Sequence, residues 1–192
     1  MPRTVRKILP SYDAAMLERA ALDYAARYAT TQAKLRAYLR RKLRERGWAG
    51  DGPPPVDAVV ERFAERGYVD DRAFASARTD ALLRRGYGAR RIDTALRAAG
   101  IDADTTRSLS DRIAAGGEQA AIQFARRKRI GPYAATGPDP AQRRRWIAAM
   151  ARAGHPIEVV LRVLDIPAGE EDIDPDGFPR DGGDRSRHGE SE

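Results

Sequence analysis

The sequence predicts an all-α protein built from three tandem three-helix repeats. Three observations support this fold class. Hydrophobic residues make up 42% of the 192-residue chain but aromatic residues only 7%, and Ala and Leu dominate the apolar set, which favours thin, closely packed helices. Apolar residues recur with a period near 3.6. The residues Gly47, Gly100 and Gly154 stand 53 and 54 positions apart, which indicates an internal repeat.

The register around these three glycines is shared. Four residues before each glycine stand Leu43, Leu96 and Met150, and eight residues before stand Leu39, Ile92 and Trp146. Positions four and eight apart lie on one face of a helix, so each middle helix should bury the same two positions. Three small modules of this kind are expected to pack in series into an elongated, curved body, of either hand.

The first repeat is expected over residues 13–69. Its first helix has Asp13 as the candidate N-cap and carries an apolar face through Tyr28. A second helix should begin at Thr30 or Thr31 and end at Gly47, where a glycine suits the left-handed position after a helix. A third helix should follow the Gly/Pro-rich linker and end at Gly67.

The second repeat is expected over residues 70–115 and the third over residues 116–167. In the second, helices should be separated at Gly86–Gly88 and Gly100, and a shorter helix capped by Asp102 or Asp104 should reach Ile113 and Ala114. The third should start after Gly116-Gly117. Its helices are expected over residues 118–129, 139–153 and 156–164, with Pro156 at the first helical position.

The two flanks have a different composition. Residues 1–12 form a basic segment that we expect to be mobile. Residues 168–192 contain nine acidic residues against three arginines, lack apolar period and are rich in Gly and Pro, which predicts a disordered acidic tail. This tail carries a charge of about −6 within a net +7, so residues 1–167 carry about +13 and can attract a polyanion or an acidic protein surface.

The composition excludes several classes of catalytic site. The chain has no cysteine and only two histidines, His155 and His188, so it cannot assemble a thiolate zinc site or a histidine-centred nucleophile relay. No phosphate-binding loop or dinucleotide fingerprint is present. We therefore expect no enzyme activity, no metal and no cofactor. The absence of a signal peptide or a long apolar run predicts a cytoplasmic protein without a membrane span.

Two groups of residues that could carry chemistry are better explained by folding. The pair Asp70-Asp71 could hold a magnesium ion, but it stands at a helix start, where aspartate caps exposed amides and favours the helix dipole. Four aromatic residues could stack on bases, but their helical spacing indicates packing: Tyr38, Trp48, Phe63 and Trp146.

Basic residues gather on each repeat, near the junction of its first two helices. The candidate binding residues for a partner protein or DNA are Arg36, Arg40, Arg41, Arg44, Arg84, Arg85, Arg90, Arg91, Arg127, Arg129, Arg143 and Arg144. Guanidinium binds phosphates and carboxylates with two hydrogen bonds at once. Two interpretations without a binding function stay open. The basic residues could form ordinary solvated helix faces. The predominance of Arg, 31 of 35 basic residues, could reflect a GC-rich coding sequence.

Several segments resemble the RecX family of recombinase modulators. The stretch Gly67-Tyr68-Val69-Asp70-Asp71-Arg72-Ala73-Phe74-Ala75 is similar to the family's glycine turn, paired aspartates and Phe-Ala helix start. Residues 87–92 and 96–101 resemble its second repeat, and residues 35–47 its first. The resemblance covers roughly residues 14–165. The third repeat departs most, because it has a Gly/Pro-rich insertion and His155 where an aromatic residue is expected.

This resemblance implies a protein that binds the RecA recombinase, lodges in the groove of its filament on DNA, and restrains filament extension, ATP turnover and strand exchange. DNA, single- or double-stranded, would be a second partner through the basic faces. The alternative is a helical nucleic-acid-binding protein that acts alone, although no recognition helix is evident. No long heptad pattern is present, so we expect a monomer.

Overall fold

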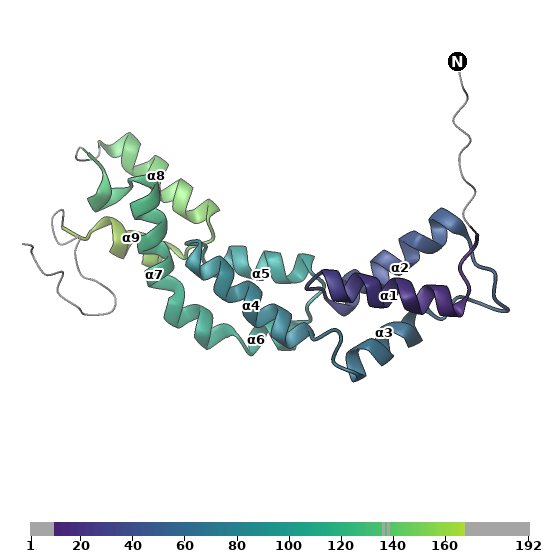
Figure 1. The fold of residues 1–192 in the computed structure, drawn as a ribbon. Helices are drawn as coiled ribbons and strands as arrows, with labels where there is room; N and C mark the ends of the chain where they lie inside the picture. Colours follow the sequence, from purple (N-terminus) through teal and green to yellow (C-terminus); the bar gives the residue numbers. More distant parts are fainter. Residues whose placement is uncertain (1–9, 136, 138, 168–192) are drawn as a thin grey trace, which may run out of the picture.

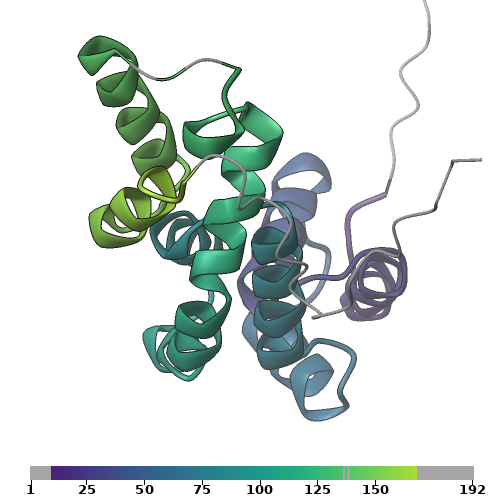
Figure 2. The same ribbon diagram turned by 90° about the vertical axis from the view of Figure 1, so that its left-hand side faces the viewer.

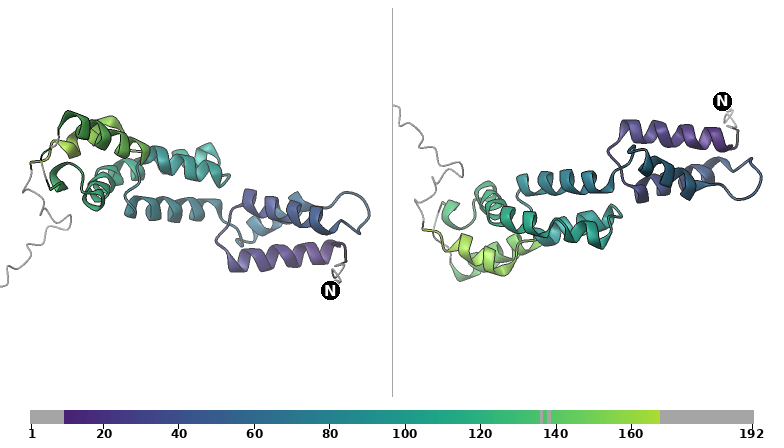
Figure 3. Two further views of the ribbon diagram at one scale, coloured as in Figure 1. Left: turned by 90° about the horizontal axis from the view of Figure 1, so that it is seen from above. Right: turned by 90° about the horizontal axis from the view of Figure 1, so that it is seen from below.

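The described part of the chain is an elongated row of helices. The structure is a computed structural model, and it describes residues 10–135, 137 and 139–167. Within these residues all regular structure is helical and no strand occurs. Helices α1 to α3 lie at one end of the body and α8 and α9 at the other (Figures 1 and 3). The predicted all-α fold of tandem three-helix repeats is confirmed, whereas the predicted disorder of residues 168–192 lies outside the described residues.

The first repeat consists of α1 (Ala14–Arg27), α2 (Gln32–Arg46) and α3 (Val56–Glu65). Its caps agree with the sequence prediction: Asp13 accepts a hydrogen bond from Met16 N, and Thr31 accepts one from Lys34 N. The core of this repeat is closed by side chains of all three helices, with the fully buried Leu17, Leu35 and Val60 at its centre.

The segment before α1 is more ordered than expected. Residues 1–12 were predicted to be mobile, and residues 1–9 lie outside the described part. Tyr12, however, is buried in the first core and pairs with the chain after α2: Tyr12 N donates to Gly47 O, and Ala49 N donates to Tyr12 O. The physical reason is that Tyr12 adds an aromatic ring to a small core, so the first repeat begins before its first helix.

The second repeat contains α4 (Asp71–Arg84), α5 (Ala89–Ala98) and the five-residue α6 (Ala103–Arg107). Asp70 caps α4 by accepting from Ala73 N at 2.9 Å, and Asp102 caps α6 by accepting from Thr105 N at 2.7 Å. The structural interpretation of Asp70 is therefore confirmed.

Two expectations about helix boundaries are wrong. The helix capped by Asp102 was expected to reach Ile113 and Ala114, but α6 ends at Arg107 and these two residues lie in the next helix. The chain was predicted to break at Gly116-Gly117, but both residues lie inside a single 19-residue helix, α7 (Ser110–Lys128). A Cβ on Gly117 would meet nothing within 4 Å, while one on Gly116 would lie 3.0 Å from Leu83 of α4. Gly116 thus permits close packing of α7 on α4, and tertiary contacts outweigh the low helix propensity of glycine. The boundary expected between residues 115 and 116 falls within this helix.

The third repeat combines the second half of α7 with the 3₁₀ turn η1 (Gly131–Tyr133), α8 (Pro140–Arg152) and α9 (Ile157–Leu164). Asp139 caps α8 by accepting from Gln142 N. Pro156 is the residue before α9 instead of its first helical residue, a shift of one position. Figure 2 looks along the body: α8 and α9 lie to one side of α7, and α1 lies toward the opposite side of the view.

The repeat register predicted from the sequence is present. Gly47, Gly100 and Gly154 all have positive φ, at 81°, 77° and 96°, one or two residues beyond the C-terminal end of a middle helix. Of the six side chains expected inside, five are buried; Leu43 is only partly buried and packs on the first core. The four aromatic residues interpreted as packing all contact a core: Phe63 and Trp146 are buried, while Tyr38 and Trp48 cover the first core from its edge.

Candidate interaction surface

The arginine stripe of the first repeat is partly neutralised. Arg36 Nε lies 2.6 Å and Arg40 Nη2 3.4 Å from the two carboxylate oxygens of Asp57 on α3. The hydrogen bond from Arg36 is the main cause that holds the pKa of Asp57 below its usual value, so this carboxylate stays charged. Arg41 pairs with Glu45 at 3.7 Å, and Arg44 is exposed. Two of the four predicted positions therefore already share a counter-ion.

The junction of the second and third repeats is built by close contact between two glycine turns. Gly88 N donates to Ala153 O at 3.0 Å, and Arg90 N donates to Gly154 O at 3.1 Å. A Cβ on Gly88 would lie 2.4 Å from the backbone of Gly154, so only glycine permits this approach. The start of α5 is thereby fixed against the end of α8.

Two arginines of the second repeat lie against Tyr87 at this junction, and an arginine of the third repeat contacts one of them. The guanidinium carbons of Arg85 and Arg91 each lie 5.7 Å from the centre of the Tyr87 ring. Arg127, at the end of α7, donates from Nη1 to Arg85 O at 2.7 Å. Tyr87 itself is partly buried and packs on the cores of both the second and the third repeat, so its ring is held in place.

We name this surface the junctional basic cluster, and it comprises Arg84, Arg85, Arg90, Arg91 and Arg127. All five side chains are exposed. Among the described residues, no carboxylate forms an ion pair with any of them. The structure thus brings together five of the twelve predicted residues from two repeats, and it leaves their charge uncompensated.

The other three predicted residues of the third repeat have different structural roles. Arg143 pairs with Asp165 at 2.8 Å and ties α8 to the end of α9. Arg129 adopts a left-handed conformation with φ of 53° and ends α7. Arg144 is exposed on α8.

His155 lies beneath the junction. It is 1% exposed, and its Nε2 lies 3.2 Å from Gly86 O. Because a carbonyl only accepts, Nε2 carries the proton, and Nδ1 has no hydrogen-bond partner within the described structure. Burial lowers the pKa of His155, which favours the neutral ring. The residue is a packing element of the joint, in contact with Phe124.

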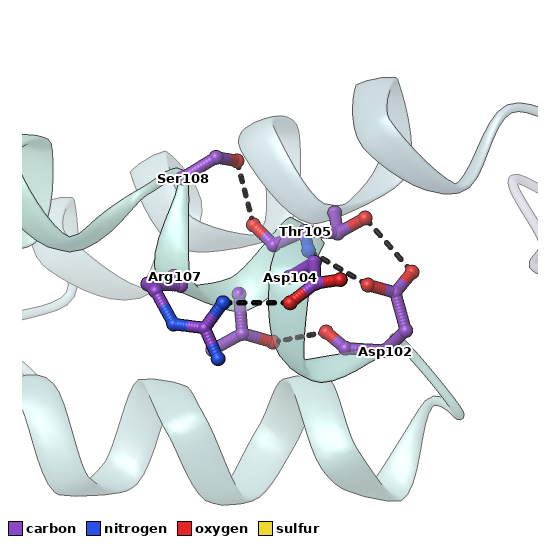
Figure 4. A network of polar contacts seen from close by, with 6 residues as sticks. Asp102, Asp104, Thr105, Arg107 and Ser108 are labelled. Atoms are coloured by element: carbon purple, nitrogen blue, oxygen red, sulfur yellow. Dashed lines mark hydrogen bonds and ion pairs between the residues drawn. The ribbon is translucent and has the colours of Figure 1, made fainter.

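An acidic pocket of ≈ 730 Å³ lies where the first repeat meets the second. Its four aspartates are engaged in the fold: Asp71 Oδ1 accepts from Gln32 N, and Asp102 accepts from both the amide and the hydroxyl of Thr105. Figure 4 shows this second network together with the Arg107–Asp104 pair. The bond from the Thr105 amide is the main cause that lowers the pKa of Asp102.

Across the described ranges, no group of three His, Asp or Glu side chains is arranged to hold a metal ion. In the same ranges, no helix has the length and apolarity needed to cross a membrane.

Sequence analysis missed several residues that shape these surfaces. Tyr87 was not selected as a candidate, although an aromatic residue between two arginine pairs is a signal that could have been used. Asp57 as counter-ion of the first repeat was also missed, because it is distant in sequence from Arg36 and Arg40. The exposed cations Lys128, Arg145 and Arg152 were not selected, and they line a pocket between α7 and α8.

Comparison with known proteins agrees with this architecture. Residues 70–108 match a family described as RecX, second three-helix domain. The chain is 33% identical over 178 residues to the regulatory protein RecX of Myxococcus xanthus, covering 85% of this chain and 90% of that protein. It is 32% identical over 156 residues to the regulatory protein RecX of Thermobifida fusca, covering 80% of each.

A solved structure supports the fold. The crystal structure of a regulatory protein RecX superposes with a TM-score of 0.59 at 19% identity, covering 79% of this chain and 73% of that one. The matches to sequence relatives extend over most of the chain and include the helices that build the junction. The chain therefore belongs to the RecX family of regulatory proteins.

Proposed function

We propose that this protein regulates the RecA recombinase by binding along the groove of its filament on DNA, where it restrains filament extension, ATP hydrolysis and strand exchange. The observation that carries this proposal is the junctional basic cluster, in which five exposed arginines without carboxylate partners lie at the junction of the second and third repeats, and two of them lie against the Tyr87 ring. Membership in a family of regulatory proteins favours this function over catalysis.

The shape of the molecule supports binding along a repeating partner. A row of three similar modules can place similar faces against successive protomers of a helical filament. The guanidinium groups at the joint would bind acidic protein edges or DNA phosphates, since their planar fork donates two hydrogen bonds and keeps its charge. In this proposal the protein acts as a cytoplasmic monomer that bridges neighbouring protomers and blocks their conformational cycling.

The test is the ATPase rate of the cognate RecA on single-stranded DNA, titrated with this protein below one copy per protomer. We expect inhibition at these substoichiometric ratios. The double variant Arg85→Gln, Arg91→Gln retains the aliphatic stems over Tyr87 but removes two charges, and it should need a several-fold higher concentration for the same inhibition. The matched control is Arg97→Gln, Arg107→Gln, which removes the same charge from exposed arginines already paired with Asp93 and Asp104.

Two outcomes would contradict the proposal. Equal weakening by both double variants would mean that net charge matters and the cluster does not. Inhibition that appears only when the protein saturates the DNA would indicate a nucleic-acid-binding protein that competes for the strand. Raising the salt concentration should weaken inhibition steeply if phosphates are contacted, and each lost phosphate contact should reduce the slope of log affinity against log salt by about 1.

A further inference from the structure

The pocket between α7 and α8 differs in its charge from the acidic pocket described above. Its volume is ≈ 480 Å³, and its floor is formed by Phe124, Ile130 and Trp146, which are all at most 8% exposed. Its rim carries three exposed cations, Lys128, Arg145 and Arg152, and no carboxylate lines it. We name it the α7–α8 pocket.

The rim cations have no counter-ion from the folded body. Within the described residues, none of the three forms an ion pair. The pocket between α1 and α3 is different: it is lined by both signs of charge, and Glu18 there pairs with Arg62. An apolar floor within a ring of unpaired cations fits a peptide that carries one large apolar side chain among carboxylates.

The chain itself contains such a segment. Residues 170–181 hold six acidic residues, and within residues 168–192 the single aromatic residue is Phe178, with Asp176 and Asp181 on either side. An aromatic ring is suited to the floor, because Phe124 and Trp146 offer ring faces and edges against which it can pack.

The tail also leaves the body beside this pocket. The end of α9 is held against α8 by the Arg143–Asp165 ion pair, two residues before Arg145. It also lies against the residue that follows Ile130: a Cβ on Gly131 would be 3.0 Å from the side chain and 3.4 Å from Cα of Leu164. Phe178 is 11 residues beyond Pro167. That length of chain reaches at most about 36 Å, more than the roughly 20 Å length of the 13-residue α8.

We propose that the α7–α8 pocket is the binding site of the chain's own acidic C-terminal segment, with Phe178 on the apolar floor and the flanking carboxylates on Lys128, Arg145 and Arg152. Bound there, the segment places negative charge over the basic end of the third repeat. This proposal does not depend on RecA or DNA, and its test contains neither. Its failure would therefore leave the proposed function untouched, and the reverse also holds.

The absence of cysteine makes a direct test possible. A nitroxide on a single cysteine, Gly177→Cys, in the full-length chain broadens nearby amide signals in ¹⁵N–¹H spectra. The two indole N–H signals measure proximity of the nitroxide at two positions: Trp146 lies in the pocket and Trp48 in the first repeat. We expect several-fold stronger broadening for Trp146 than for Trp48, and weaker broadening at high salt, because screening reduces the attraction.

Matched variants separate docking from mere proximity. Phe178→Ala in the labelled chain should remove most of the broadening, whereas Phe178→Leu should retain it. Arg145→Glu with Arg152→Glu should release the segment, while Arg27→Glu with Arg78→Glu changes the net charge equally on exposed positions outside the pocket and should have no effect.

Three results would overturn the proposal. The first is equal broadening with Phe178→Ala, which means that the segment is near the pocket only because it is attached there. The second is no selective broadening of Trp146. The third is broadening of the Trp146 signal in a mixture of nitroxide-carrying ¹⁴N chain and nitroxide-free ¹⁵N chain, which would assign the pocket to the tail of a second copy.

Discussion

The two joints between repeats are built differently. Between the first and second repeats the contacts are few and mainly polar: Thr31 Oγ1 donates to Ala99 O at 2.6 Å, Gln32 N donates to Asp71 at 2.9 Å, and Lys34 lies over the Phe74 ring. The core of the first repeat is formed by residues of that repeat alone. The joint is therefore a small set of directed bonds between two separately packed bodies.

The second and third repeats share structure. Helix α7 belongs to both, Tyr87 packs on both cores, and the glycine turns at Gly88 and Gly154 meet backbone to backbone. The comparison teaches that similar repeats in sequence need not behave as equal units: the second and third form one rigid block, and the first is attached to it. The five arginines of the junctional basic cluster lie at the joint between these two repeats.

The largest expected effect is at the rigid joint. In Gly154→Ala, the new Cβ would lie 2.4 Å from Arg91 N in a residue with φ of 96°, so clash and backbone strain add. We expect a loss of about 2–4 kcal/mol in the free energy of unfolding. The control is Gly67→Ala, at φ of 74° with nothing within 4 Å, which should cost only about 1 kcal/mol in strain. Thermal denaturation measures both; equal losses would contradict the rigid joint.

A smaller effect is expected at the polar joint. Thr31→Val keeps the shape but removes the cap on Lys34 N and leaves the Ala99 carbonyl without its donor, for a cost of about 1–3 kcal/mol. Hydrogen exchange should accelerate mainly in α1 to α3. Thr94→Val, which removes an exposed hydroxyl bonded to its own helix, should change little. Exchange that accelerates uniformly along the chain would show that the first repeat is not a separate unit.

The buried histidine predicts a pH dependence of the rigid joint. Burial holds the pKa of folded His155 below the value of 6.5 expected in the unfolded chain. The unfolded state therefore binds the proton more readily, and stability should fall as the pH drops through 6.5 and below it. Asp57 and Asp102, whose pKa values are lowered from 3.8, lose their contribution only at more acidic pH. Urea denaturation of wild type and His155→Asn tests this: the variant should show a flatter pH profile, and an unchanged slope would exclude His155 as the cause.

The smallest expected change in stability tests whether α7 is continuous at its two glycines. Gly117→Ala adds a methyl group in open space within a helix, so it should stabilise the protein by about 0.5–1 kcal/mol. Gly116→Ala should gain less, because its Cβ would lie 3.0 Å from Leu83. Urea denaturation measures both. Destabilisation by Gly117→Ala would mean that the helix breaks there after all.

Much of the local structure could be predicted from single residues. Asp13, Thr31, Asp70 and Asp102 cap helices as expected, because capping depends on a side chain and amides only two or three residues away. The shared register of the middle helices was also predictable, since burial of one helix face imposes its period on the sequence. The break expected at Gly116-Gly117 was wrong because propensity is weak compared with packing on α4.

The candidate surface was predictable only as a list of residues. Guanidinium groups were assigned to each repeat, but several of them are neutralised by carboxylates that are distant along the chain: Arg40 pairs with Asp57, 17 positions away, and Arg143 with Asp165, 22 positions away. That Arg127 of the third repeat reaches Arg85 of the second depends on packing between the two repeats, which includes the contact between Gly88 and Gly154, 66 positions apart.

The sequence by itself determined the helical class, the three repeats, their caps and the excess of positive charge before residue 168, because each of these follows from composition, period or neighbours along the chain. Only the tertiary structure decided that α7 unites two repeats, that the first repeat is joined by a few polar contacts, and that arginines from two repeats meet at one junction. These features arise from contacts between segments that are distant in the sequence. Their contribution to the free energy of folding depends on how closely the packed atoms approach each other, which no local sequence pattern specifies.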